Sequence, residues 1–302
     1  MIDLCGLRLA DPVLNGSGTF DAIAAQRVFG DALVDDFPFS AFVSKTITLA
    51  PRAGNPPPRL WETAAGMINS IGLPNRGLAG YLEHDLPRLA ALGVPLITNV
   101  MGAGADELVR LVDALGAREE VAAIELNVSC PNVRTGLDIG ADPRELDAVL
   151  RAVRPHATKP LIVKLTPNTA DVGLVARAAQ DAGADAVSLI NTLRAYAPSP
   201  RGGGEPWLGG ETGGLSGPAI RAVALAQVRA VARRVTIPVI GMGGIQSGAH
   251  AAQFLAVGAT AVAVGTESFR DPAAGARIRR ELAEIHAKSG NTPPWKSSVS
   301  VA

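Results

Sequence analysis

The sequence is short of cysteine and histidine, and these shortages exclude several kinds of site. Among 302 residues there are only two cysteines, Cys5 and Cys130. One distant pair makes neither a disulfide framework nor the ligand set of an iron–sulfur cluster. The four histidines are scattered and no CxxC or HxxH spacing occurs, so we expect no metal site.

The chain also lacks an excess of either charge and any long apolar run. Lys and Arg number 28, and Asp and Glu number 28, which gives no support to a general binder of nucleic acid or of membrane surfaces. No apolar stretch approaches the roughly 18 residues of a membrane helix. The first residues, Met1-Ile2-Asp3-Leu4-Cys5, lack the features of a signal peptide. We therefore expect a cytoplasmic protein without nucleic-acid or membrane partners.

What the chain does contain is a repeated strand–helix pattern. Short, continuous apolar runs are typical of parallel strands buried on both faces. Amphipathic stretches lie between them, as where Asp142-Pro143 predicts a helix N-terminus. The pattern predicts one (β/α)8 barrel domain over residues 1–302, with an open doubly wound sheet as the alternative and a weakly ordered tail over 289–302. The expected strands are Val13–Gly16, Ala41–Thr46, Leu96–Val100, Ala122–Val128, Leu161–Leu165, Ala186–Asn191, Val239–Gly241 and Ala261–Gly265.

Polar residues recur at the carboxyl ends of these strands, the rim where barrel enzymes place their sites. Gly243-Gly244 and Gly265-Thr266 suit a phosphate-bearing cofactor, because glycines let backbone N–H groups approach phosphate. Lys45 and Lys164 each follow apolar residues and should face an anion, although a structural salt bridge is the alternative for each. The amides of Asn69, Asn127 and Asn191 suit a ring with alternating N–H and C=O groups, such as a pyrimidine.

Cys130 lies in the segment Asn127-Val128-Ser129-Cys130-Pro131-Asn132, just past the fourth expected strand. A cysteine at the rim can act as a base or nucleophile when its surroundings assist. Taken alone, a single cysteine is more often inert, and Cys5 is interpreted in that way.

Several of these segments together resemble the class 1 dihydroorotate dehydrogenases, from about Leu4 to Phe269. The most specific are the Asn-Ser-Cys-Pro-Asn-type segment around Cys130 and the M-x-N-x-x-G-L segment, whereas the glycine motifs are less so. The matching segments are Ser44–Thr46, Gly66–Asn75, Glu125–Asn132, Val163–Asn168, Gly213–Pro218 and Gly241–Ile245.

The resemblance implies a set of roles. Cys130 would be the base that removes a proton from C5 of dihydroorotate, while hydride passes from C6 to N5 of FMN. Lys164 would stabilise charge on the reduced ring. The substrate would be held by Lys45, Asn69, Ile71, Gly72, Leu73, Asn127, Asn191 and Thr192. FMN would be held by Ser17, Lys45, Thr46, Asn99, Asn127, Lys164, Ile190, Gly217, Gly243, Gly244, Gly265 and Thr266.

The segments Gly66–Asn75 and Pro51–Asn55 look most like class 1B, which pairs with an iron–sulfur and FAD subunit and passes electrons to NAD. The resemblance also implies a homodimeric core. The sequence departs from the family pattern at Arg134-Thr135-Gly136 and in the loop over residues 194–210. These departures bear on the expected electron acceptor more than on the expected oxidation of dihydroorotate.

Other interpretations stay open. They are a fumarate-using class 1A enzyme, a dihydropyrimidine dehydrogenase-like reductase, a tRNA dihydrouridine synthase and a flavin-binding scaffold without activity. Lys45 favours a substrate with a carboxylate, and no basic RNA-binding face is evident.

Overall fold

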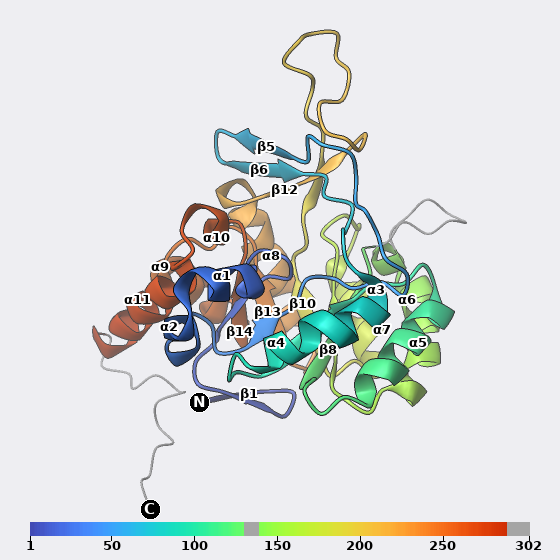
Figure 1. Ribbon diagram of the computed structural model, residues 1–302, viewed down its shortest axis with the longest axis vertical. Coiled ribbons are helices and arrows are strands. Elements are labelled where there is room, and N and C mark those ends of the chain that lie inside the picture. The colour runs from blue at the N-terminus through green and yellow to red at the C-terminus, as the bar shows by residue number, and fades with distance from the viewer. Residues whose placement is uncertain (130–138, 289–302) are drawn as a thin grey trace, which may run out of the picture.

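The computed structural model describes residues 1–129 and 139–288, and an eight-stranded parallel sheet forms the centre of this part (Figure 1). Its strands follow one another around the sheet in chain order, which confirms the predicted (β/α)8 barrel and all eight expected strands. They are β3 (Val13–Asn15), β4 (Phe42–Val43), β7 (Leu96–Val100), β8 (Ala123–Asn127), β9 (Leu161–Lys164), β10 (Ala186–Leu189), β13 (Val239–Met242) and β14 (Ala261–Val264).

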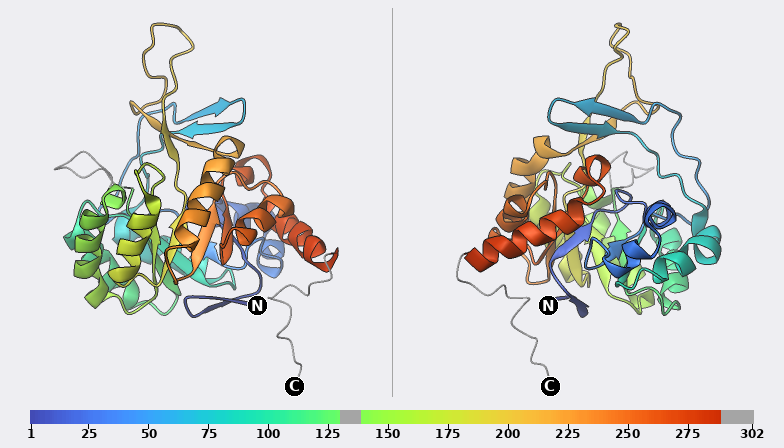
Figure 2. Two further views of the ribbon diagram at one scale, coloured as in Figure 1. Left: turned by 180° about the vertical axis from the view of Figure 1, so that it is seen from behind. Right: turned by 60° about the vertical axis from the view of Figure 1, so that its left-hand side comes forward.

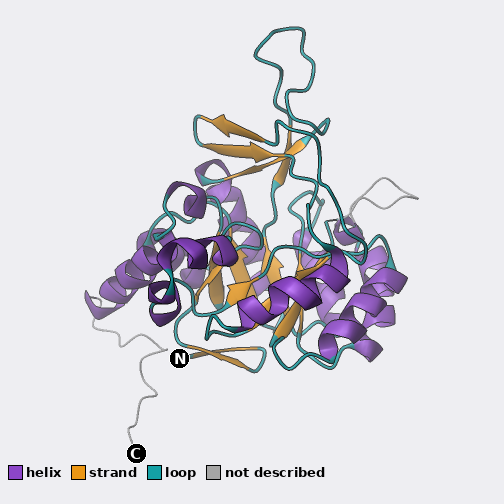
Figure 3. Cartoon of the chain, in the orientation of Figure 1, coloured by secondary structure: helices purple, strands orange, loops and turns teal. Residues whose placement is uncertain are grey.

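Helices surround the strands on the outside (Figure 3). The predicted cap is confirmed, because the Asp142 side chain accepts a hydrogen bond from the Arg144 N–H at the start of α6. The α-helices are α1 (Ala22–Phe29), α2 (Asp31–Asp35), α3 (Gly77–Gly80), α4 (Leu86–Ala90), α5 (Ala105–Gly116), α6 (Pro143–Val153), α7 (Val172–Asp181), α8 (Arg221–Ala232), α9 (Gly248–Ala256), α10 (Glu267–Arg270) and α11 (Ala274–Lys288). A π-helix, η1 (Tyr81–Asp85), joins α3 to α4, and the 3-10 turns are η2 (Ile139–Ala141), η3 (Arg154–His156) and η4 (Pro218–Ile220).

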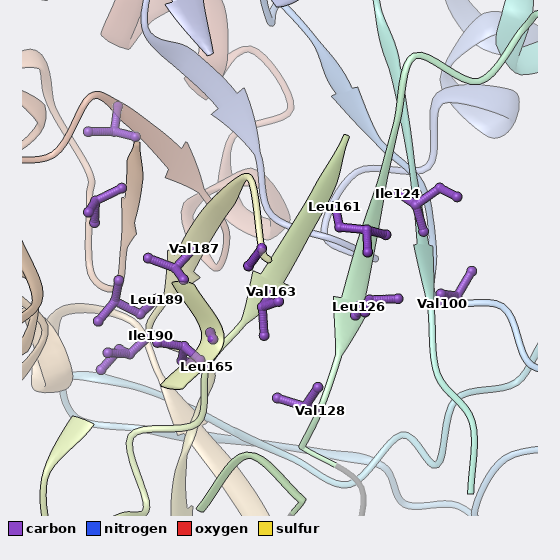
Figure 4. Close-up of a cluster of buried hydrophobic side chains, with 14 of the residues drawn as sticks. Val100, Ile124, Leu126, Val128, Leu161, Val163, Leu165, Val187, Leu189 and Ile190 are labelled. Carbon is purple, nitrogen blue, oxygen red and sulfur yellow. The ribbon is translucent and has the colours of Figure 1, made fainter. Parts of the chain in front are cut away.

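The alternation of side chains along each strand creates two apolar layers. Outward-facing residues such as Val163, Val187 and Leu126 pack with the helices in one large cluster (Figure 4). Inward-facing residues such as Ile97 and Ile162 fill the barrel itself. Leu4 and Leu9 of a short hairpin, β1 (Ile2–Leu4) and β2 (Leu7–Leu9), join this inner cluster at one end of the barrel. The hairpin therefore leaves the other end, where the strands finish, for a site.

The side chain of Asn15 helps to close the barrel at the junction of β3 and β4, the two strands at the ends of the eight-stranded sheet order. Its Nδ2 donates to the Val43 carbonyl at 2.8 Å, and its Oδ1 accepts from the Val43 N–H at 2.8 Å. One backbone bond, from Ser40 N to the Val13 carbonyl at 2.9 Å, supports the same junction. An amide side chain thus satisfies backbone groups that a regular strand ladder would otherwise pair.

A second, smaller sheet stands over the carboxyl ends of the barrel strands (Figures 1 and 2). Its antiparallel strands are β5 (Leu60–Thr63), β6 (Gly66–Asn69), β11 (Leu193–Ala195) and β12 (Gly213–Ser216). A long connection between β11 and β12 projects furthest from the barrel (Figure 2). The rings of Trp61 and Trp207 pack edge to face in an apolar cluster of this sheet, with 6.1 Å between their centroids. These strands were not predicted and form a roof above the barrel mouth.

Among the described residues, no helix has the length and apolar character needed to cross a membrane.

Candidate functional site

A cavity of about 470 Å³ lies at the carboxyl ends of the barrel strands, under the roof sheet. Its volume falls in the range of small-molecule sites. Both parts of the structure line it, since Lys45 and Asn127 follow or end barrel strands while Met67 and Asn69 belong to β6. The roof therefore turns the open rim of the barrel into a concave site.

Most of the residues predicted from the sequence line the wall of this cavity. They are Ser17, Lys45, Thr46, Asn69, Ile71, Leu73, Asn127, Lys164, Ile190, Asn191, Thr192, Gly217, Gly243, Gly244, Gly265 and Thr266.

Three of the predicted residues are not among these lining residues. Gly72 does not line the cavity: its φ is +73°, and a Cβ there would come within 2.5 Å of the Asn55 backbone nitrogen, so it shapes the turn between Ile71 and Leu73. Asn99 is completely buried and does not reach the wall either. Cys130 lies outside the described residues. The individual roles of all these residues stay predictions.

Two lysines of low exposure, together with the exposed Arg194, give the cavity its positive charge. Lys164 ends β9 and is 7% exposed, and Lys45 follows β4 and is partly buried. Neither ammonium forms an ion pair with a carboxylate of the described residues. Burial and the neighbouring Lys164 ammonium lower the pKa of Lys45 from its usual value. Two cations held together at low solvent exposure favour the binding of an anion.

Amide groups from three separate elements line the same cavity. The Asn191 Nδ2 donates to the Ser129 hydroxyl at 3.0 Å, and the Asn191 Oδ1 accepts from the Thr192 N–H at 3.0 Å. The Asn127 Oδ1 accepts from the Ser129 N–H at 3.3 Å, and the Asn69 Nδ2 donates to the Gly214 carbonyl at 3.2 Å. These bonds fix which amide atom faces which way, so the wall presents both donors and acceptors to a bound ring.

Glycines shape the opposite side of the cavity. Gly244 has a φ of +72°, and a Cβ there would come within 2.8 Å of both the Arg221 Cβ and the Gly217 carbonyl oxygen. A Cβ at Gly265 would meet only the Thr19 Cγ2, at 3.7 Å, so the wall is open at this point. The backbone is thus accessible where the two last barrel strands end, as a phosphate group requires.

A polar network lies beneath the wall, inside the barrel. Glu125, which is 2% exposed, accepts hydrogen bonds on both carboxylate oxygens. The Asn99 Nδ2 donates to its Oε2, and the Ser188 hydroxyl donates to its Oε1 at 2.7 Å. The Asn99 Oδ1 is buried and has no hydrogen-bond partner among the described residues.

Several wall residues were not predicted to belong to the site. Asn168 accepts from the Arg194 N–H at 2.9 Å, so it connects the β9 loop to β11 of the roof. The Thr266 hydroxyl donates to the Ser216 hydroxyl at 2.8 Å and connects β14 to β12 in a similar way. Asn168 and Ser216 lie in segments that the resemblance already covered, Val163–Asn168 and Gly213–Pro218, and this was the available signal. Phe269 of α10 also lines the cavity, and no sequence signal marked it.

Comparison with known proteins assigns the family. The family model for dihydroorotate dehydrogenase matches residues 1–285. A protein of Citrifermentans bemidjiense named "Dihydroorotate dehydrogenase B (NAD(+)), catalytic subunit" is 46% identical over 282 residues, covering 93% of this chain and 91% of the relative. A protein of Bacillus pumilus with the same name is 43% identical over 290 residues, covering 96% and 92%.

A relative from Solibacter usitatus carries the provisional name dihydroorotate dehydrogenase A (fumarate). It is 45% identical over 288 residues, which cover 95% of this chain and 93% of the relative. The matches thus extend over nearly the whole chain, the cavity included. The chain belongs to the dihydroorotate dehydrogenase family.

Proposed function

We propose that the chain binds FMN in the cavity under the roof sheet and there oxidises dihydroorotate to orotate, a step of pyrimidine biosynthesis. The observation that carries this proposal is the pair of lysines, Lys45 and Lys164, held without a carboxylate partner in the described structure. A carboxylate-bearing substrate and a phosphate-bearing cofactor supply the anions that such a site favours.

The residues present fit a flavin with a phosphate group. The accessible backbone at Gly265 and the positive φ of Gly244 suit the phosphate, and the cavity's mixed polar and apolar wall suits a ring system. Ser17, Thr46, Ile190, Gly217, Gly243 and Thr266 complete the proposed FMN site, with Lys164 beside the ring. Asn99, which does not reach the cavity wall, would support this site from below.

Bound FMN supplies the acceptor for the hydride that leaves C6 of dihydroorotate. The chain's own residues bind and orient. Lys45 holds the substrate carboxylate, while Asn69, Asn127 and Asn191 pair with the C=O and N–H groups of the pyrimidine ring. Ile71 and Leu73 cover it from the loop after β6, together with the backbone at Gly72 and Thr192.

Cys130 is the proposed base for the proton at C5. Support comes from the family resemblance of its segment and from Asn127, which precedes it by three residues and ends β8 at the cavity. A base must reach within hydrogen-bond distance of the proton that it removes. The thiolate is the form of cysteine that can accept this proton.

The proposed electron acceptor is NAD, reached through a partner subunit with FAD and an iron–sulfur cluster. The names of the Citrifermentans and Bacillus relatives support this class 1B assignment, and the two cysteines of this chain cannot hold such a cluster. The Solibacter name favours fumarate as a second candidate. Assays of the purified chain with NAD and with fumarate, alone and with the partner subunit, separate the two.

A homodimeric core, implied by the resemblance, and the cytoplasmic location expected from the sequence belong to the same proposal. Gel filtration with light scattering tests the first, and cell fractionation tests the second.

The proposal is tested by removing and returning the flavin. Apoprotein titrated with FMN should take up one equivalent, and only the reconstituted protein should convert dihydroorotate. Lys164→Met should weaken FMN binding, because it removes a cation from the cavity. A preparation that takes up no flavin and still forms orotate would contradict the proposal.

A further inference from the structure

Glu125 is a charged residue in an otherwise apolar stretch of β8, and its side chain lies inside the barrel. Residues two apart on a strand point to the same face, so Glu125 lies on the side of β8 that carries Asn127 at its end. Glu125 therefore lies inside the barrel, directly below the part of the cavity that Asn127 and Lys164 line, which we call the cavity floor.

The hydrogen bonds of Glu125 engage both oxygens of its side chain. The Asn99 Nδ2 can only donate, and it donates to the Glu125 Oε2. The Ser188 hydroxyl donates to the Glu125 Oε1 at 2.7 Å. Both carboxylate oxygens therefore have a hydrogen-bond partner, and the side chain is 2% exposed.

These bonds place the side chain of Glu125 on the inner face of the strands that flank Lys164. Lys164 on β9 pairs in register with Asn127 of β8 on one side and with Ser188 of β10 on the other. The Glu125–Ser188 bond joins β8 to β10 and so spans the inner face of β9, the strand that Lys164 ends. Yet Glu125 forms no ion pair with either lysine of the described cavity, so both ammonium groups stay available to a ligand.

We propose that Glu125 is a positioning residue that holds Asn99 and Ser188 in place and, through its charge, sets how strongly the cavity floor attracts anions. Two lysines alone would give this floor an excess of positive charge at low dielectric, where Coulomb interactions are strong. The Glu125 carboxylate offsets part of that charge without occupying a binding position. It thereby limits the affinity for an anionic product and lowers the reduction potential of a bound flavin.

The test rests on the proposed function and uses the whole chain reconstituted with FMN. Glu125→Gln keeps the size of the side chain and removes its charge. The amide oxygen can still accept from Asn99, and the new Nε2 can donate to the Ser188 hydroxyl, which is able to accept after rotating. Orotate should then bind about three- to tenfold more tightly, and the midpoint potential of the bound flavin should become more positive. Damage to the packing would instead weaken orotate binding, so the sign of the change separates the two explanations.

Two control variants isolate the charge. Ser188→Ala removes one hydrogen bond to Glu125 and keeps its charge, so orotate affinity and flavin potential should stay near the wild-type values. Glu119→Gln removes a charge from an exposed residue before the opposite end of β8 and should likewise change neither quantity. An equal gain in orotate affinity from Glu119→Gln would overturn the inference.

The wild-type chain separates this inference from the proposed function. Wild-type protein that binds neither FMN nor orotate would refute the proposed function and the inference with it. Wild-type protein that binds both, with orotate affinity and potential unchanged or lowered in Glu125→Gln, would refute the inference alone. If Glu125→Gln does not fold, Glu125→Asp, which keeps the charge, should fold and match the wild-type potential, and failure of both variants would assign Glu125 a purely structural role.

Discussion

Replacement of Asn15 by alanine should open the junction between β3 and β4. The Asn15 side chain satisfies both the N–H and the carbonyl of Val43, and it is completely buried. A buried backbone group left without its partner costs about 1–3 kcal/mol, so the two groups together should cost about 4 kcal/mol of unfolding free energy. The same change should disturb the cavity, because β3 leads to Ser17 and β4 leads to Lys45.

This cost converts to a measurable shift in melting temperature. With an unfolding entropy of about 2.1 cal/mol/K per residue, a chain of 302 residues should lose about 6 °C in Tm. Thermal and urea unfolding followed by circular dichroism measure the loss, and FMN titration measures the effect on the cavity. Asn55→Ala is the control, since its amide bonds to Ser70 lie outside the barrel, and it should cost only about 1 kcal/mol. An Asn15→Ala protein within about 1 kcal/mol of wild type would refute the role assigned to Asn15.

Further predictions concern the site itself. Cys130→Ala should still bind FMN and orotate but should reduce its flavin about 10²–10⁴-fold more slowly in anaerobic stopped-flow measurements; an unchanged rate would remove Cys130 as the base. Orotate affinity should fall as pH rises through the lowered pKa of Lys45, and in Lys164→Met at saturating FMN this fall should move to higher pH, because a neighbouring cation is gone. A midpoint that does not move would contradict the coupling of the two lysines. Gly244→Ala should weaken FMN binding, since its φ of +72° and the nearby Arg221 Cβ exclude a methyl group; calorimetry with FMN checks this, and wild-type affinity would contradict it. The isolated chain should reduce NAD poorly and gain that activity with its partner subunit, whereas fast reduction by the chain alone would refute the class 1B acceptor.

The barrel could be predicted from the sequence because its strands are short and continuously apolar, as buried parallel strands are. The roof sheet could not be predicted, because β11 has three residues and β12 contains Gly213 and Gly214, which have low strand propensity. The hairpin of β1 and β2 was not predicted for a similar reason, because each strand has only three residues. Its stability comes from Leu4 of β1 and Leu9 of β2, which are buried in the inner cluster of the barrel.

The site was predictable where a polar residue ends a strand, as Asn127 and Lys164 do. The polar network around Glu125, beneath the cavity, was not recognised from the sequence, although the period of two along β8 places Glu125 on the same face as Asn127. Asn99 follows the strand-end rule as well, yet its side chain turns to Glu125 and is covered. Such choices between lining a cavity and supporting it depend on tertiary packing, which strand periodicity does not contain.

Anaerobic mixing of the FMN-loaded chain with dihydroorotate tests the central claim most directly. The flavin absorbance should bleach, and one equivalent of orotate should form for each flavin reduced, without any other protein present. Flavin that stays oxidised in the presence of saturating dihydroorotate, or that bleaches without orotate being formed, would contradict the proposed reaction.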